Sequence, residues 1–137
     1  MKTIQIISLF LFIIILHLFP LGSKCYGSGS MADPPQISFE ENEYDFGVIM
    51  PGDAAVHYFV FSNSGSGPLV ISNVRSSCGC TVPAWPKTPI QAGARDSLKV
   101  EYNTKIKGAF NKTITVQSNA ANPMVELRIK GSVSKTK

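Results

Sequence analysis

Residues 113–130, with the sequence TITVQSNAANPMVELRIK, determine the kind of fold that this chain can adopt. In residues 113–117, apolar side chains occupy every second position and polar side chains lie between them. The same alternation returns in residues 125–130, after a segment that is rich in asparagine and contains proline. Because successive side chains of a β-strand point to opposite faces, a period of two predicts two strands, each with one buried and one solvated face. The intervening residues predict a turn.

The period of two continues outward over the rest of the chain. Further runs that we predict as strands are residues 37–40, 44–48, 56–61, 69–74 and 97–102. The turn-forming sequences between runs include PGD at 51–53, NSGSGP at 63–68, AGA at 92–94 and KG at 107–108. The run 56–61 is apolar on both faces, which indicates a strand in the middle of a sheet. Helical apolar spacing does not persist for three turns anywhere after the amino-terminal segment. We therefore predict an all-β domain of about seven strands, arranged as an immunoglobulin-like β-sandwich.

The amino-terminal segment has the layout of a secretory signal peptide. Lys2 provides a positive start, residues 4–21 are almost entirely apolar, and small and polar residues follow. An apolar run of this length is also close to the roughly 20 residues of a membrane-spanning helix, so an uncleaved anchor is the alternative. Lipid attachment to Cys25 is a third hypothesis, although Lys24 stands where a bacterial lipobox has a small residue. Each route takes the domain out of the cytoplasm.

These features divide the chain of 137 residues into four predicted segments. Residues 1–27 form the signal peptide, residues 28–36 a flexible tether, residues 37–134 the β-sandwich domain and residues 135–137 a tail. We expect a secreted protein in the periplasm or cell envelope, with a membrane-anchored lipoprotein as the alternative. Contact with the membrane would occur only through the signal segment or the lipid anchor.

The charges are unevenly distributed along the chain. Of 13 basic residues, the signal peptide removes Lys2 and Lys24, and all the others lie at or after Arg75, whereas six of the nine acidic residues precede it. Such asymmetry occurs in proteins that bind nucleic acid. Here, however, the lysines alternate with apolar strand residues, as on a solvated sheet face, and the sequence has no recognition helix and no RNP-like aromatic pair. We predict no nucleic-acid binding.

Beyond these patterns, the chain resembles the bacterial DUF1573 family over roughly residues 38–133. The resemblance rests on FGV at 46–48, PG at 51–52, FVFSNSG at 59–65, PLVISNV at 68–74 and SCGCTVP at 77–83, and then on WP at 85–86, PI at 89–90, Gly93, Gly108, Phe110, residues 113–116, SN at 118–119 and Gly131. The family is similar to the ASH and major-sperm-protein-like modules, so the resemblance implies an immunoglobulin-like sandwich. It implies no biochemical activity.

Cys78, Gly79 and Cys80 form the chemically distinctive element of the sequence. In a strand, residues i and i+2 share a face and lie about 6.6 Å apart. This distance is near the upper limit of roughly 6.8 Å for the Cα atoms of a disulfide, and Gly79 can leave the β region and shorten it. Three hypotheses follow: a structural disulfide, a redox-active or redox-sensing dithiol, and a soft-metal site that binds copper or zinc through two thiolates.

The redox and metal hypotheses lack further supporting residues. Tetrahedral zinc requires four ligands, and the sequence adds only His57, which we interpret as structural because it lies between apolar strand residues. Met50 or Met124 would complete a copper site only if the fold brought them close to the cysteines. Arg75 is the one nearby cation that would favour a thiolate, and no helix amino terminus is predicted beside the cysteines. We expect no cofactor, with copper or zinc as the alternative.

The sequence also lacks a catalytic constellation. After removal of the signal peptide one histidine remains, and neither a nucleophile elbow nor a glycine-rich phosphate loop is present. We predict no enzyme activity, with thiol-redox chemistry as the only exception. The leading hypothesis is a non-catalytic binding or scaffolding module for an envelope or extracellular protein. The competing hypothesis is thiol-redox or metal handling through Cys78 and Cys80, which exposure of both sulfurs at a loop tip would favour and burial under Trp85 would disfavour.

Overall fold

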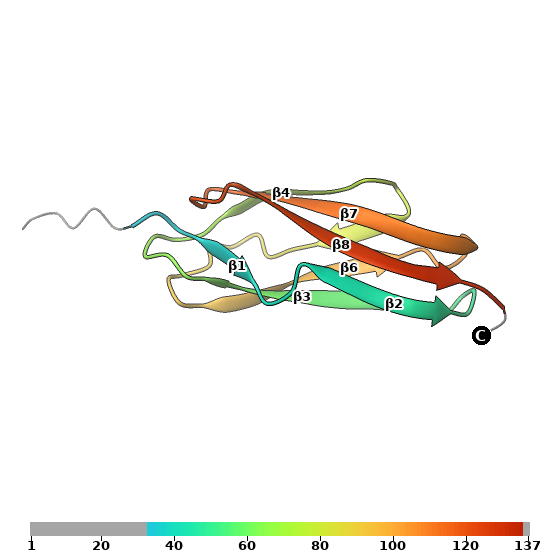
Figure 1. Ribbon diagram of the computed structural model, residues 1–137. Helices are drawn as coiled ribbons and strands as arrows, with labels where there is room; N and C mark the ends of the chain where they lie inside the picture. The colour runs from blue at the N-terminus through green and yellow to red at the C-terminus, as the bar shows by residue number, and fades with distance from the viewer. Residues whose placement is uncertain (1–32, 136–137) are drawn as a thin grey trace, which may run out of the picture. The chain divides into compact units, whose positions relative to one another are not determined.

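The computed structural model describes residues 33–135, which form a β-sandwich of eight strands in two sheets (Figure 1). The strands in chain order are β1 (Ile37–Phe39), β2 (Glu43–Ile49), β3 (Ala55–Asn63), β4 (Ile71–Ser76), β5 (Thr81–Ala84), β6 (Arg95–Tyr102), β7 (Gly108–Ser118) and β8 (Met124–Val133). The predicted signal peptide, Cys25 and most of the predicted tether lie outside the described residues. Within residues 33–135, no helix is long and apolar enough to cross a membrane.

Each sheet has four strands. The order is β1-β3-β6-β5 in the first sheet and β2-β8-β7-β4 in the second. All neighbouring strands are antiparallel except β2 and β8, which are parallel. In Figure 1 the β7–β8 pair lies over the β3–β6 pair, so the two sheets pack face to face. The prediction of a central strand at residues 56–61 is confirmed, because β3 lies between β1 and β6.

The inward faces of the two sheets form one hydrophobic core. Phe59 pairs directly with Leu98 in the first sheet, and Ile114 pairs directly with Leu127 in the second. All four side chains are 0% exposed and belong to one cluster of buried residues. Full burial of a side chain of this size contributes about 1.5–3 kcal/mol. The alternation seen in the sequence therefore has the predicted cause, since every second residue enters this core.

Strand β5 is the element that the sequence pattern missed. It has four residues and contains Pro83, and proline lacks the N–H that a strand donates to its neighbour. Proline is tolerated here because β5 lies at the edge of the first sheet and pairs only with β6. The strand predicted at residues 69–74 is also displaced. β4 begins later, at Ile71, while Leu69 forms an isolated bridge to Ile90.

Charges that are separated along the sequence are paired in space. Because β2 lies beside β8, the Glu43 carboxylate is 2.5 Å from the Lys130 ammonium. The hydrogen bond to Glu43 and its negative charge raise the pKa of Lys130. Glu40, after β1, forms an ion pair with Arg95 at the start of β6. Exposed ion pairs of this kind add little to stability, but they show that acidic residues from the first half of the sequence meet basic residues from the second half at these two places.

A buried asparagine joins the loops at one end of the sandwich. Asn63, the last residue of β3, is 0% exposed. Its side-chain amide donates to the carbonyl oxygens of Gly67 and Ile90 at 2.7 and 3.0 Å. Its Oδ1 accepts from the backbone N–H groups of Gln36 and Gly65 at 3.2 and 3.1 Å. The full hydrogen-bonding capacity of the amide is thus used to hold three chain segments together.

Candidate functional site

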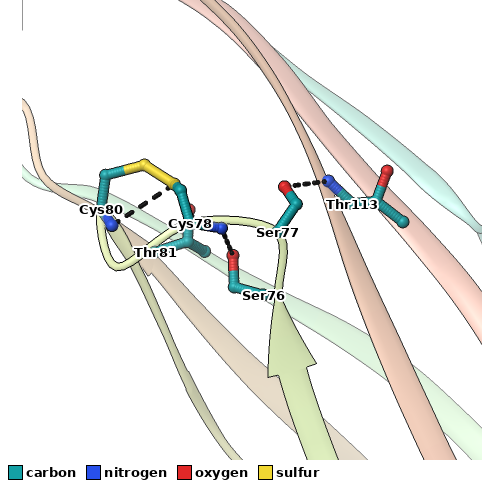
Figure 2. The surroundings of a disulfide bond; sticks show 6 residues. All are labelled: Ser76, Ser77, Cys78, Cys80, Thr81 and Thr113. Atoms are coloured by element: carbon teal, nitrogen blue, oxygen red, sulfur yellow. Dashed lines mark hydrogen bonds between the residues drawn. A yellow bond between two sulfur atoms is a disulfide. The ribbon is translucent and has the colours of Figure 1, made fainter.

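The disulfide loop, residues 76–81 (SSCGCT), connects the second sheet to the first. β4 ends at Ser76 and β5 begins at Thr81, so the loop crosses between edge strands of the two sheets. Cys78 and Cys80 are joined by a disulfide, with their Cα atoms 5.3 Å apart (Figure 2). Because the two cysteines lie in a turn and not in a strand, this distance is shorter than the about 6.6 Å of two alternate residues in an extended strand.

Both ends of the loop are held by hydrogen bonds to neighbouring segments. The backbone N–H of Ser77 donates to the carbonyl oxygen of Thr113 at 2.9 Å, and the N–H of Thr113 donates to Ser77 Oγ at 3.2 Å (Figure 2). At the other end, the N–H of Asn103 donates to the carbonyl oxygen of Cys80 at 2.8 Å. The loop is therefore anchored to β7 in the second sheet and to the segment after β6 in the first, by contacts that do not depend on the disulfide.

The disulfide is half-buried. Cys80 packs against the hydrophobic core, whereas Gly79 between the two cysteines is exposed. A Cβ atom added at Gly79 would meet no atom within 4 Å, and the residue does not have a positive φ. The fold thus requires glycine at this position neither for backbone conformation nor for space. The sulfurs match neither of the two extremes considered from the sequence, exposure of both at a loop tip or burial of both.

A pocket of about 650 Å³ adjoins the loop. Its lining comes from the β2–β3 turn, the disulfide loop, β5, the end of β6 and the turn that follows: Gly52, Asp53, Ala54, Ala55, Gly79, Cys80, Val82, Glu101, Tyr102, Asn103, Thr104 and Lys105. Tyr102 is 4% exposed, and its ring stacks on Phe110 with centroids 3.8 Å apart. Burial raises the pKa of Tyr102.

Sequence reasoning identified only the cysteine element of this pocket. The other lining residues come from segments far apart in the chain, and only strand pairing brings them together. Ala55 of β3 and Thr81 of β5 both pair with Tyr102 of β6, which places the β2–β3 turn and the disulfide loop at the same end of the first sheet. No local pattern in the sequence signals this juxtaposition.

The structure does not assemble the metal ligands considered from the sequence. Both cysteine sulfurs are bonded to each other and are not thiolates in this state. Within residues 33–135, no group of three or more His, Cys, Asp and Glu side chains is placed to hold a metal ion. Met124 pairs with Gln117 of β7, four residues along the strand from the Thr113 anchor and thus roughly 13 Å away. Met50 is exposed after β2 and lies outside the pocket lining.

His57 is held in a different part of the sandwich. Its ring stacks on Tyr44, with centroids 3.6 Å apart, and its Nε2 lies 2.8 Å from Glu41 Oε1. The side chain is 16% exposed. His57 belongs to β3, which β6 separates from β5 and the disulfide loop. Its contacts are those of a packed side chain that connects β3 to the segment leading into β2.

Thiol-redox chemistry finds no support in the surroundings of the loop. Residues 33–135 contain no helix, so no helix amino terminus is available there to lower a thiol pKa. Arg75 is exposed on β4, where it pairs with Thr115. The feature that the structure shows for the loop is its anchoring to both sheets.

Solved structures with the same fold come from proteins of several kinds. A protein of unknown function from Porphyromonas gingivalis W83 is 16% identical, with a TM-score of 0.68, and the match covers 80% of this chain and 51% of that one. The ASH/PapD-like domain of human CEP192 is 8% identical, with a TM-score of 0.64 and coverage of 76% and 89%. The YadV chaperone is 12% identical, with a TM-score of 0.55 and coverage of 74% and 54%. At these identities the likeness shows the fold alone.

The chain thus spans about half the length of the Porphyromonas gingivalis protein and of the chaperone. No curated protein matches its sequence. The family model described as "Protein of unknown function (DUF1573)" matches residues 37–133, from the first residue of β1 to the last residue of β8. The predicted immunoglobulin-like fold related to ASH domains is confirmed, and the chain belongs to the DUF1573 family.

Proposed function

We propose that this protein is a secreted or periplasmic binding module of the cell envelope without catalytic activity, and that a partner protein contacts the disulfide loop and the adjoining pocket. The observation that carries the proposal is the combination of a loop anchored to both sheets with a pocket of about 650 Å³ beside it. The volume of this pocket lies within the range of about 300–1,000 Å³ found for binding pockets, and Tyr102 and Val82 supply apolar surface among its polar lining residues.

The anchoring of the loop favours binding in physical terms. A flexible loop loses conformational freedom when a partner orders it, and this loss weakens the complex. Here the disulfide, the Ser77–Thr113 pair and the Asn103–Cys80 hydrogen bond already restrict the loop. A partner would therefore meet a surface that needs little further ordering.

Gly79 supports the same proposal. Since the fold does not require glycine there, its effect is to leave the backbone of the exposed turn uncovered at the rim of the pocket. A glycine allows the backbone of another chain to approach closely. An alanine or larger residue at position 79 would be compatible with the sandwich but would narrow this approach.

The comparisons support the class of function only. Similar sandwiches occur in a protein named as a chaperone and in an ASH domain, and one fold carries many functions. The family description assigns no activity.

Site-specific photo-crosslinking in cells of the source organism tests the proposal. A photoreactive residue placed at Lys105, which is exposed in the pocket lining, is expected to crosslink one defined envelope protein. The same residue at Glu126, which is exposed on the opposite sheet, serves as the control and should not. Equal crosslinking at both positions, or none at Lys105, would contradict the proposal.

A second variant separates loss of the site from loss of the fold. Gly79→Leu should abolish the crosslink from Lys105 while leaving the thermal unfolding midpoint nearly unchanged, because Gly79 is exposed and a Cβ atom there meets open space. Gly79→Ala should reduce the crosslink only in part. A Gly79→Leu protein that crosslinks as well as the unaltered protein would show that the pocket rim is not the contact.

A further inference from the structure

Strand β3 is longer than the strand that covers its outer edge. β1 pairs with β3 only from Phe61 to Asn63, although β3 begins at Ala55. After β1 the chain crosses to the other sheet, where it forms β2 (Figure 1). Among the described residues 33–135, no strand therefore pairs with residues 55–60 on the side of β3 that faces away from β6.

Two hydrogen bonds establish the direction in which each β3 residue points its backbone groups. The N–H of Asn63 donates to the carbonyl oxygen of Ala94, the residue before β6, at 3.0 Å. The N–H of Glu40, directly after β1, donates to the carbonyl oxygen of Val60 at 3.0 Å. Residues of an antiparallel strand bond alternately to one neighbour and to the other. The odd-numbered residues of β3 therefore bond towards β6, and the even-numbered residues point to the side of β1.

Val56 and Tyr58 are consequently left with backbone groups that point to the uncovered side. Their two N–H and two C=O groups have no hydrogen-bond partner among residues 33–135. Val56 is half-buried and Tyr58 is 53% exposed. We call residues 55–59 of β3 the open edge. A row of unpaired N–H and C=O groups of this kind is a template for another strand.

Three other edges of the two sheets carry features that oppose strand addition. On β1, the Asn122 side chain accepts from the N–H of Ile37 at 3.2 Å and donates to its carbonyl oxygen at 2.8 Å. A β-bulge interrupts β2, where Asp45 Oδ1 accepts from the N–H of Gly47 at 2.8 Å. Pro83 of β5 has no N–H to offer. The open edge of β3, in contrast, contains no proline, no glycine and no register shift.

From this geometry we propose that the open edge binds a short extended segment of another protein, which adds a strand antiparallel to β3 and in line with β1. This chain limits the length of the added strand at both ends. At one end Glu40 is bonded to Val60, and at the other the N–H of Asp53 donates to the carbonyl oxygen of Met50 in the β2–β3 turn. Residues 55–59 span about 17 Å. A gap of this length fits a linear segment better than the surface of a second folded domain.

The open edge selects the segment by its backbone and by every second side chain. Two residues of the segment, separated by one, exchange both backbone hydrogen bonds with Val56 and Tyr58. Their side chains then lie on the outer face of the sheet, directly beside those of Val56 and Tyr58. Cross-strand neighbours of valine and tyrosine are favourable when they are β-branched or aromatic. We therefore expect such side chains at alternate positions of the segment.

Peptides selected from a random phage-displayed library against the purified protein serve as the probe. They should carry β-branched or aromatic residues at alternate positions and bind with micromolar dissociation constants in fluorescence anisotropy. Val56→Pro should raise the dissociation constant by about tenfold or more, because it removes an N–H that the added strand needs. The fold should remain intact, since this N–H takes no part in pairing with β6. Gly79→Leu, at the pocket, should leave the dissociation constant unchanged, because Val56 and Tyr58 do not line the pocket.

Methylation of the peptide backbone separates strand addition from other modes of binding. N-methyl groups at the two residues that pair with Val56 and Tyr58 should abolish binding. One at the residue between them should have little effect, because its N–H points away from β3. A library that yields no binder sensitive to Val56→Pro, or binders that tolerate N-methylation at every position, would overturn the proposal.

Sedimentation equilibrium of the free protein distinguishes the proposed segment from a second copy of this chain. The free protein should remain monomeric at the concentrations used for peptide binding. A dimer that Val56→Pro dissociates would assign the open edge to a second copy and would also overturn the proposal. Because these measurements use only the purified protein and selected peptides, they do not depend on the crosslink expected from Lys105.

Discussion

Replacement of Asn63 by alanine should be among the most destabilising polar substitutions in this domain. The side chain is 0% exposed and makes four hydrogen bonds to backbone groups of three segments. Alanine cannot make any of these bonds, and it leaves the backbone groups in place. The loss of stability therefore depends on whether water can replace the side chain as the hydrogen-bond partner of each backbone group.

The structure separates the four bonds into two classes. The bonds to the carbonyl oxygens of Gly67 and Ile90 are buried, whereas those from the N–H groups of Gln36 and Gly65 are only partly buried. Water can replace the second class, at a loss of about 0.5–1 kcal/mol each, while each buried carbonyl without a partner costs about 1–2 kcal/mol. We expect Asn63→Ala to lower the free energy of unfolding by about 3–6 kcal/mol, a large part of the roughly 5–15 kcal/mol typical of a domain.

Urea unfolding followed by the fluorescence of Trp85 measures this loss directly. Asn111→Ala is the matched control, since Asn111 is exposed on β7, and it should change the free energy of unfolding by less than about 0.5 kcal/mol. Asn63→Asp keeps an acceptor but loses both donors, so at neutral pH it should be at least as destabilising as alanine. A loss below about 1 kcal/mol for Asn63→Ala, with an unchanged dependence on urea, would refute the reasoning.

Three further predictions concern the glycines, the disulfide and the buried tyrosine. Gly65→Ala should lower the free energy of unfolding by about 2 kcal/mol or more, because the new Cβ would overlap backbone atoms of the segment that leads into β1. Gly79→Ala should change it by less than about 0.5 kcal/mol, and similar thermal midpoints for the two variants would contradict this. Cys78→Ser/Cys80→Ser should cost only about 1.5 kcal/mol in urea unfolding, since the disulfide closes a very short ring; failure to fold would show that the loop contacts are not sufficient. Burial raises the pKa of Tyr102, so stability should be complete below about pH 10 and fall as the pH rises further, when only the unfolded chain ionises. Tyr102→Phe should reduce this fall between about pH 9 and pH 11, and equal falls in both proteins would count against it.

The sequence predicted those parts of the fold that depend on one strand at a time. Ile114 and Leu127 could be assigned to the core because alternation along a strand is a local property, and both are 0% exposed. The central position of residues 56–61 followed from apolar residues on both faces. The interpretation of the uneven charge as a solvated sheet surface agrees with the pairing of Glu43 with Lys130.

The pairing partners of the strands could not be predicted in the same way. The parallel contact of β2 with β8 joins segments more than 80 residues apart, and neither segment contains a pattern that specifies the other. Strand β5 has only four residues and contains a proline, so its sequence shows no recognisable strand pattern. It becomes a strand only because β6 presents a free edge.

The same distinction between local sequence and tertiary structure holds for the candidate site. The sequence by itself marked Cys78 and Cys80 as the chemical centre, because two cysteines separated by a glycine are visible without any fold. Tertiary structure alone decided that they lie in a turn between sheets, that Ser77 and Cys80 are anchored to different sheets, and that Tyr102 completes a pocket beside them. The physical reason is that side-chain alternation is encoded locally, residue by residue, whereas a pocket exists only where hydrogen-bonded strands from distant parts of the chain end side by side.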